Sequence, residues 1–176
     1  ILAETRAWVE RAVIGLNLCP FAKAVQVRDQ IRYVVSDATE ADALLGILRE
    51  ELSLLAAADP ARVETTLLIH PCALTDFAEF NDFLGVAEAA VEASGYSGVL
   101  QVASFHPQYQ FAGTAVDDVT NATNRSPYPT LHLLREESID RAVAAFPEAS
   151  TIYEGNIRTL RALGTQGWAA LQAHWC

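Results

Sequence analysis

Residues 99–136 read VLQVASFHPQYQFAGTAVDDVTNATNRSPYPTLHLLRE, and the rest of the chain is organised around this stretch. It holds two apolar runs of strand length, with His106 directly after the first and His132 inside the second. The segment between the runs is rich in Asn, Asp, Ser, Thr, Tyr and Arg. Connections longer than about 12 to 15 residues in compact domains are usually functional loops or disordered linkers. We therefore expect the functional site in this connection.

The periodicity of the whole chain predicts an α/β fold. Short β-branched and apolar runs predict strands at Ile31–Val35, Thr65–Ile69, Val99–Phe105 and Thr130–Leu134. Apolar residues three and four apart predict helices at 4–16, 37–58, 75–95, from 136 and at 151–164, with a short last helix around 168–175. We expect one domain over residues 1–176, with an approximately four-stranded, mixed and partly parallel sheet and five or six helices. Since Val99–Phe105 is almost entirely apolar or small, we expect that strand at the centre of the sheet.

Composition narrows the classes of partner. The chain has 12 Lys and Arg residues against 22 Asp and Glu residues, a formal net charge of −10. This charge disfavours nucleic acid and anionic membranes as partners. The titratable groups that gather on the long connection make a small-molecule ligand the expected partner. Charges interrupt the apolar runs before the roughly 20 residues of a membrane span, and no basic-then-apolar leader is visible, so we expect a soluble cytoplasmic protein. Three cysteines at wide spacing predict free thiols.

Four residues are candidates for catalysis. His106 lies at a strand end, where open α/β sheets bind ligands, and His132, Asp118 and Cys19 are its candidate partners. His106, His132 and Asp118 also form a candidate ligand set for a divalent metal, which leaves the cofactor open. The simpler alternatives are a structural His106 bonded to a backbone carbonyl, a His132 in the core and a buried, inert Cys19. Period two places His132 on the face of Thr130 and Leu134.

Other polar residues of the stretch are candidates for binding the ligand. Arg125 has the forked guanidinium that binds carboxylate or phosphate, and Arg135 is a second candidate for orienting the substrate. Asn121, Asn124 and Ser126 are equally good turn formers, which is the simpler explanation for them. None of the common nucleotide-binding, nucleophile-elbow or zinc-protease motifs is present.

Four motifs in order resemble an uncharacterised family of bacterial proteins, a domain of unknown function. They are LNLCPFA at 16–22, ASFHPQYQF at 103–111, NRSPYP at 124–129 and HLLRE at 132–136. The resemblance extends from about Trp8 to Gly164 and implies no reaction. It implies that the residues of interest include Arg135 and the other candidates above that lie in the motifs, and it adds Tyr109, Gln110 and Glu136. His70, Cys72 and Cys176 lie outside the motifs.

Three functions fit these observations. The first is an enzyme acting on a small anionic metabolite, either with metal assistance from the histidines or through a covalent step at Cys19. The second is a non-catalytic module that binds a small molecule or regulates a partner. In the third, the loop is purely structural, and Arg125 and Arg135 pair with acidic residues inside the fold. We place the enzyme narrowly first.

Overall fold

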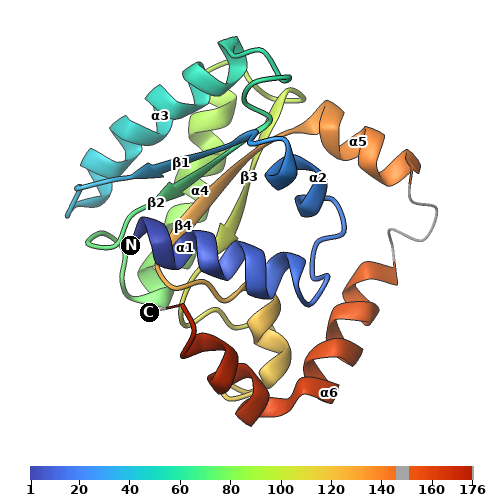
Figure 1. The fold of residues 1–176 in the computed structure, drawn as a ribbon. Coiled ribbons are helices and arrows are strands. Elements are labelled where there is room, and N and C mark those ends of the chain that lie inside the picture. Colours follow the sequence, from blue (N-terminus) through green and yellow to red (C-terminus); the bar gives the residue numbers. More distant parts are fainter. Residues whose placement is uncertain (146–150, 176) are drawn as a thin grey trace.

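The computed structural model describes residues 1–145 and 151–175, and its centre is one mixed four-stranded sheet (Figure 1). The strands are β1 (Ile31–Val35), β2 (Thr65–Ile69), β3 (Leu100–Phe105) and β4 (Thr130–Arg135), in the order β1-β2-β4-β3. β1 and β2 are parallel, whereas β4 is antiparallel to both β2 and β3. The α/β class and the mixed sheet predicted from the sequence are confirmed.

The predicted place of the third strand is wrong, because β3 lies at an edge of the sheet. The antiparallel return after residue 129 places β4 between β2 and β3. All five residues of β2 are buried, whereas only Leu100 is buried in β3. An apolar run is typical of a strand covered on both faces, but it does not fix the number of neighbouring strands.

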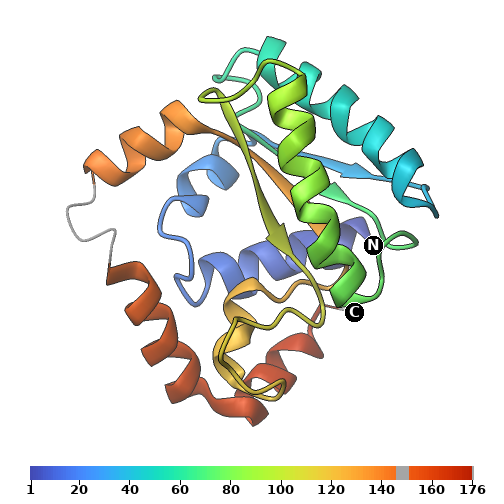
Figure 2. The same ribbon diagram turned by 180° about the vertical axis from the view of Figure 1, so that it is seen from behind.

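Two long helices cover one face of the sheet, α3 (Ala41–Ala57) and α4 (Phe77–Ala93), seen in front in Figure 2. Their leucines and phenylalanines pack with residues of β2, β3 and β4 in the larger apolar core. Leu131 and Leu133 point into this core, so His132 and Leu134 point to the other face, as period two predicts. Asp76 caps α4 by accepting hydrogen bonds from the amides of Ala78 and Glu79.

The second face is covered by α1 (Leu2–Trp8), its π-helical continuation η1 (Val9–Ile14) and α6 (Ile152–Gln172). A smaller apolar core lies here, built around Trp8, Leu160 and Trp168. α6 joins the two C-terminal helices predicted from the sequence across a kink at Gly164, whose φ of 71° favours glycine. The last described residue, Trp175, packs edge-to-face on Trp168.

Two short helices and a long loop complete the second face (Figure 1). α2 (Ala22–Val27) was not predicted, and α5 (Glu136–Ala145) has no fully buried residue. The connection 106–129 contains a 3-10 helix, η2 (Val119–Asn124), which packs against α6. Phe146, the last residue of the apolar face predicted for this helix, and Pro147, before which the helix was predicted to end, lie outside the described residues, as does Cys176. Among the described helices, none has the length and apolar character needed to cross a membrane.

Candidate functional site

The polar side chains of the 106–129 connection bind mainly to the connection itself. The Arg125 guanidinium donates to the carbonyls of Tyr109 at 3.1 Å and Val116 at 2.6 Å. Asn121, fully buried, accepts from the Phe111 amide at 3.0 Å and from the Thr114 hydroxyl at 2.8 Å. Its amide group also donates to a backbone carbonyl at 2.8 Å. These contacts satisfy groups that would otherwise be unpaired in a folded loop.

The remaining loop candidates have similar partners. Backbone carbonyls accept from the side chains of Gln110, Asn124 and Ser126, at 2.7, 3.2 and 2.6 Å. Asp118 caps η2 by accepting from the amide and hydroxyl of Thr120, and these hydrogen bonds lower the pKa of its carboxyl. The structure thus provides each of these side chains with a partner inside the loop or the neighbouring sheet.

His106 is a buried residue on the α4 side of the sheet. Its Nδ1 accepts from the Gln108 amide at 3.0 Å, so the proton is on Nε2, which donates to the Leu74 carbonyl at 3.3 Å. The ring lies against Phe77 and Phe80, with centroid distances of 5.3 and 5.0 Å, and burial lowers the pKa of the imidazole. Both ring nitrogens are therefore engaged with the protein, which is the structural alternative considered for this residue.

Tyr109 belongs to the same aromatic group. Its ring lies 5.3 Å from Phe77 and 5.0 Å from Phe111, centroid to centroid. Phe111 in turn contacts Tyr153 of α6 at 6.2 Å. The Tyr109 ring therefore links the loop to α4, and through Phe111 to α6.

His132 lies on the opposite face of the sheet from His106. Its Nε2 is 2.7 Å from the hydroxyl of Thr65, and that hydroxyl donates to the Leu133 carbonyl at 2.6 Å. Burial lowers the pKa of His132 to about 4, so the ring is neutral near pH 7. The structure does not bring His106, His132 and Asp118 together. Within residues 1–145 and 151–175, no three His, Cys, Asp or Glu side chains are close enough to share a metal ion.

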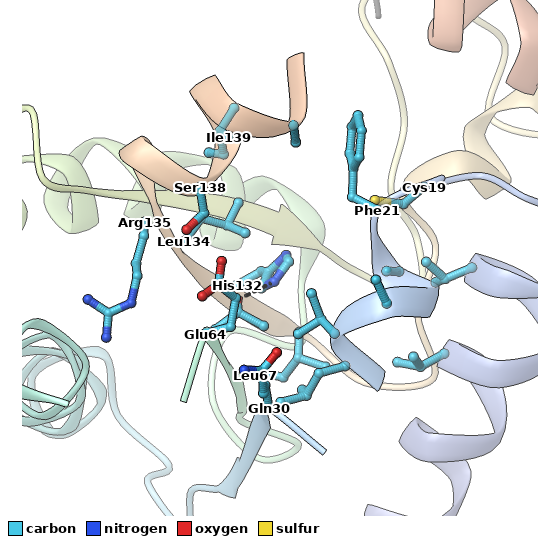
Figure 3. A pocket seen from close by; sticks show the side chains of 18 of the residues that line it. Cys19, Phe21, Gln30, Glu64, Leu67, His132, Leu134, Arg135, Ser138 and Ile139 are labelled. Atoms are coloured by element: carbon cyan, nitrogen blue, oxygen red, sulfur yellow. Dashed lines mark hydrogen bonds between the residues drawn. The ribbon is translucent and has the colours of Figure 1, made fainter. Parts of the chain in front are cut away.

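A cavity of about 610 Å³ lies on the His132 face, between the sheet and helices α1, α2 and α5 (Figure 3). Most of the exposed area of its wall is apolar, although polar and charged residues also contribute to it. The lining residues are Trp8, Val9, Val13, Cys19, Pro20, Phe21, Ala22, Ala24, Val25, Arg28, Gln30, Ile31, Glu64, Thr65, Leu67, Gln101, Phe105, His132, Leu134, Arg135, Ser138, Ile139, Arg141 and Ala142. Two of the four catalytic candidates, Cys19 and His132, therefore share one cavity.

The turn after η1 positions Cys19 on the cavity wall. Only glycine fits at position 15, because a Cβ there would lie 2.2 Å from the Arg11 carbonyl oxygen. Asn17, in the turn itself, has a positive φ of 54°. Pro20 follows, and the chain enters α2 two residues later. Burial raises the pKa of the Cys19 thiol, while hydrogen bonds from the backbone of Phe21 and Ala22 act in the opposite direction. Figure 3 shows the sulfur and the Phe21 ring on one wall, with the His132 ring on another.

The ionic side chains of the lining are three arginines and one glutamate, a formal charge of +2 in a chain of net −10. Arg135 caps the end of α3 by donating to the carbonyls of Leu55 and Ala58 at 2.6 and 2.8 Å. Within residues 1–145 and 151–175 its partners are therefore carbonyls and not carboxylates. Arg141 contacts Glu137 at 2.6 Å and Glu64 at 3.7 Å. Arg28 is exposed, and no ion pair to it is found in the described part of the chain.

Sequence reasoning missed several lining residues, among them Arg28, Thr65, Ser138 and Arg141. The Thr65 contact had a partial signal, because period two places Thr65 on the same face of its strand as Leu67. Only the observed register shows that Leu67 lies opposite His132. Arg28 and Arg141 had none, since both resemble ordinary surface charges. Glu136, a candidate from the motifs, begins α5, and its amide donates to the Val99 carbonyl at 3.0 Å.

Comparison with known proteins gives a family and no activity. The model of the family described as protein of unknown function (DUF1415) matches residues 1–170. Searches of the curated proteins and of the solved structures found no match. Since the match spans nearly the whole chain, the protein belongs to this family of unknown function.

Proposed function

We propose that the protein binds a small amphipathic acid, with an apolar body inside the cavity and an anionic group at its arginine-containing rim. The observation that carries the proposal is an apolar cavity lined by three arginines and one glutamate in a chain of net charge −10, with Arg28 exposed and without an ion pair among the described residues. Positive charge at the opening of this cavity attracts an anion locally, although the net negative charge of the whole protein repels it.

The size and walls of the cavity support this ligand class. A volume of about 610 Å³ lies in the range of about 300–1,000 Å³ that small-molecule sites occupy, and such sites are mostly apolar with a few placed polar groups. An unpaired charge in the interior would carry a large desolvation cost. The anionic group therefore belongs at the rim, where Arg28 and Arg141 are exposed to solvent.

The test compares an anion with its neutral isostere, 2-naphthoate with 2-naphthamide, by calorimetry. The double variant Arg28→Gln, Arg141→Gln should weaken 2-naphthoate binding about tenfold, as expected for losing a charge-assisted contact, and leave 2-naphthamide unchanged. Ala142→Trp, which fills the cavity from α5, should weaken both ligands. Arg158→Gln on α6, outside the cavity, is the matched control. Unchanged 2-naphthoate binding in Ala142→Trp would refute the proposal.

Catalysis in the same cavity is a second candidate, and one observation favours it: the Cys19 thiol and the His132 ring line the same cavity, from different walls. In that reaction the sulfur attacks an acyl carbonyl, the leaving group departs, and the thiol proton passes to the imidazole. p-Nitrophenyl octanoate tests it, because acylation would release one p-nitrophenolate per chain and add an octanoyl group to Cys19, detectable by mass spectrometry. Release that persists in Cys19→Ser would reject this candidate.

A further inference from the structure

The hydrogen bonds around Thr65 determine which nitrogen of His132 carries the proton. The Thr65 hydroxyl has a single hydrogen, and the Leu133 carbonyl at 2.6 Å can only accept it. The contact of 2.7 Å between the same hydroxyl oxygen and Nε2 of His132 must then use the histidine as the donor. Nε2 is therefore protonated, and Nδ1 of the neutral ring keeps a free lone pair.

Nδ1 is an unused polar atom of the cavity wall, close to its apolar part. No hydrogen bond to it is found among the described residues, and it is not one of the buried side-chain atoms without a partner, so it retains contact with the space of the cavity. Its surroundings are apolar: the Phe105 ring lies 5.9 Å from the imidazole, centroid to centroid, and Leu67 and Leu134 line the wall beside it.

We infer that the ligand of this cavity carries a hydrogen-bond donor, a hydroxyl or N–H group, on its apolar body and places it on Nδ1 of His132. A ligand atom that excludes water from Nδ1 without replacing its hydrogen bond leaves a buried acceptor unpaired, which is unfavourable. The inference rests on the proposed function and narrows its ligand class from amphipathic acids to hydroxy or amino acids of apolar skeleton.

Thr65 is the positioning residue in this arrangement, because it acts only through the tautomer of His132. Thr65→Val keeps the shape of the side chain but removes the acceptor for Nε2–H, so the ring is free to move its proton to Nδ1. The preference for a donor on the ligand should then disappear. Thr65→Ser retains the hydroxyl and should retain the preference.

The experiment uses pairs of naphthoates that share the anion and the apolar body. 2-Naphthoates with a hydroxyl at the 5, 6 or 7 position are compared by calorimetry with the methyl compound of the same position, in wild type, Thr65→Ser, Thr65→Val and His132→Phe. For at least one of the three positions, the hydroxyl compound should bind wild type and Thr65→Ser about tenfold more tightly than the methyl compound of the same position does. In Thr65→Val and His132→Phe the methyl compound should bind at least as well. Nitrogen chemical shifts of His132 should show Nε2 protonated in the free protein and Nδ1 shifting with the hydroxyl compound only.

The outcomes separate this inference from the function on which it rests. If 2-naphthoate binds and Ala142→Trp weakens it, but no hydroxyl compound is preferred over its methyl partner, the donor inference is overturned and the proposed function stands. A hydroxyl preference that survives in Thr65→Val also overturns it. If 2-naphthoate does not bind, or binds Ala142→Trp unchanged, both proposals fail.

Discussion

Acidification from pH 7 to pH 5 should destabilise the protein through His132. The native state lowers the pKa of this ring to about 4, below the ordinary 6.5, because its largely apolar surroundings remove most of its solvation and disfavour the charged form. The stability that the neutral ring contributes is therefore present above pH 6.5 and is lost as the pH falls toward 4. At pH 5 the His132 ring is protonated and charged in most unfolded chains but neutral in most folded chains. This difference corresponds to about 2 kcal/mol of lost stability relative to pH 7. His70, whose pKa burial also lowers to about 4, should add a similar loss.

The assay is urea unfolding at both pH values, followed by tryptophan fluorescence. His132→Gln removes the titrating group while its amide can still donate to Thr65, so this variant should lose about 2 kcal/mol less than wild type between pH 7 and pH 5. His174→Gln, at an exposed position, is the control and should lose as much as wild type. Equal losses in wild type and His132→Gln would refute the burial of a neutral ring in the folded protein.

Three further predictions concern residues that sequence analysis made candidates. Arg125→Met removes two hydrogen bonds to loop carbonyls and should lower the free energy of unfolding by about 2 kcal/mol in a urea titration, whereas Arg62→Met on the exposed surface should be nearly neutral. Arg135→Met leaves carbonyls at the end of α3 without their donor and should speed amide hydrogen exchange in the last turn of that helix. In a Cys72→Ser, Cys176→Ser background, the Cys19 thiol should react with iodoacetamide at pH 8 more slowly than the thiol of free glutathione does, because burial raises the pKa of Cys19. An equal rate for the two thiols would contradict this prediction.

Much of the sheet could be predicted because its strands are short apolar runs with clear ends. Ile31–Val35 and Thr65–Ile69 are the observed bounds of β1 and β2, and period two placed His132 on the correct face. The edge position of β3 could not be predicted, since strand order depends on where the long connection returns. α2 was missed because it is only six residues long and begins directly after the turn that contains Cys19 and Pro20.

The cavity could not be located from the sequence for a different reason. Its walls come from elements far apart in the chain, and the arginines at its rim have no pattern that separates them from surface charges. The polar loop attracted attention because its composition is unusual, but most of its side chains have partners within the fold. Composition shows where polar groups gather, and only the geometry shows which of them already have partners.

The loop and the cavity are connected through strand register. The Asn124 side chain donates to the Ser104 carbonyl, and the His106 amide donates to the Asn124 carbonyl, so the return of the chain is fixed against the end of β3. β4 then begins with Thr130 opposite Phe105, which places His132 opposite Ala103. A slip by one residue would turn His132 toward the core of α3 and α4 and away from Thr65. The loop residues therefore act on the cavity by setting this register, so a loop variant that keeps the register should keep ligand affinity even where its stability falls.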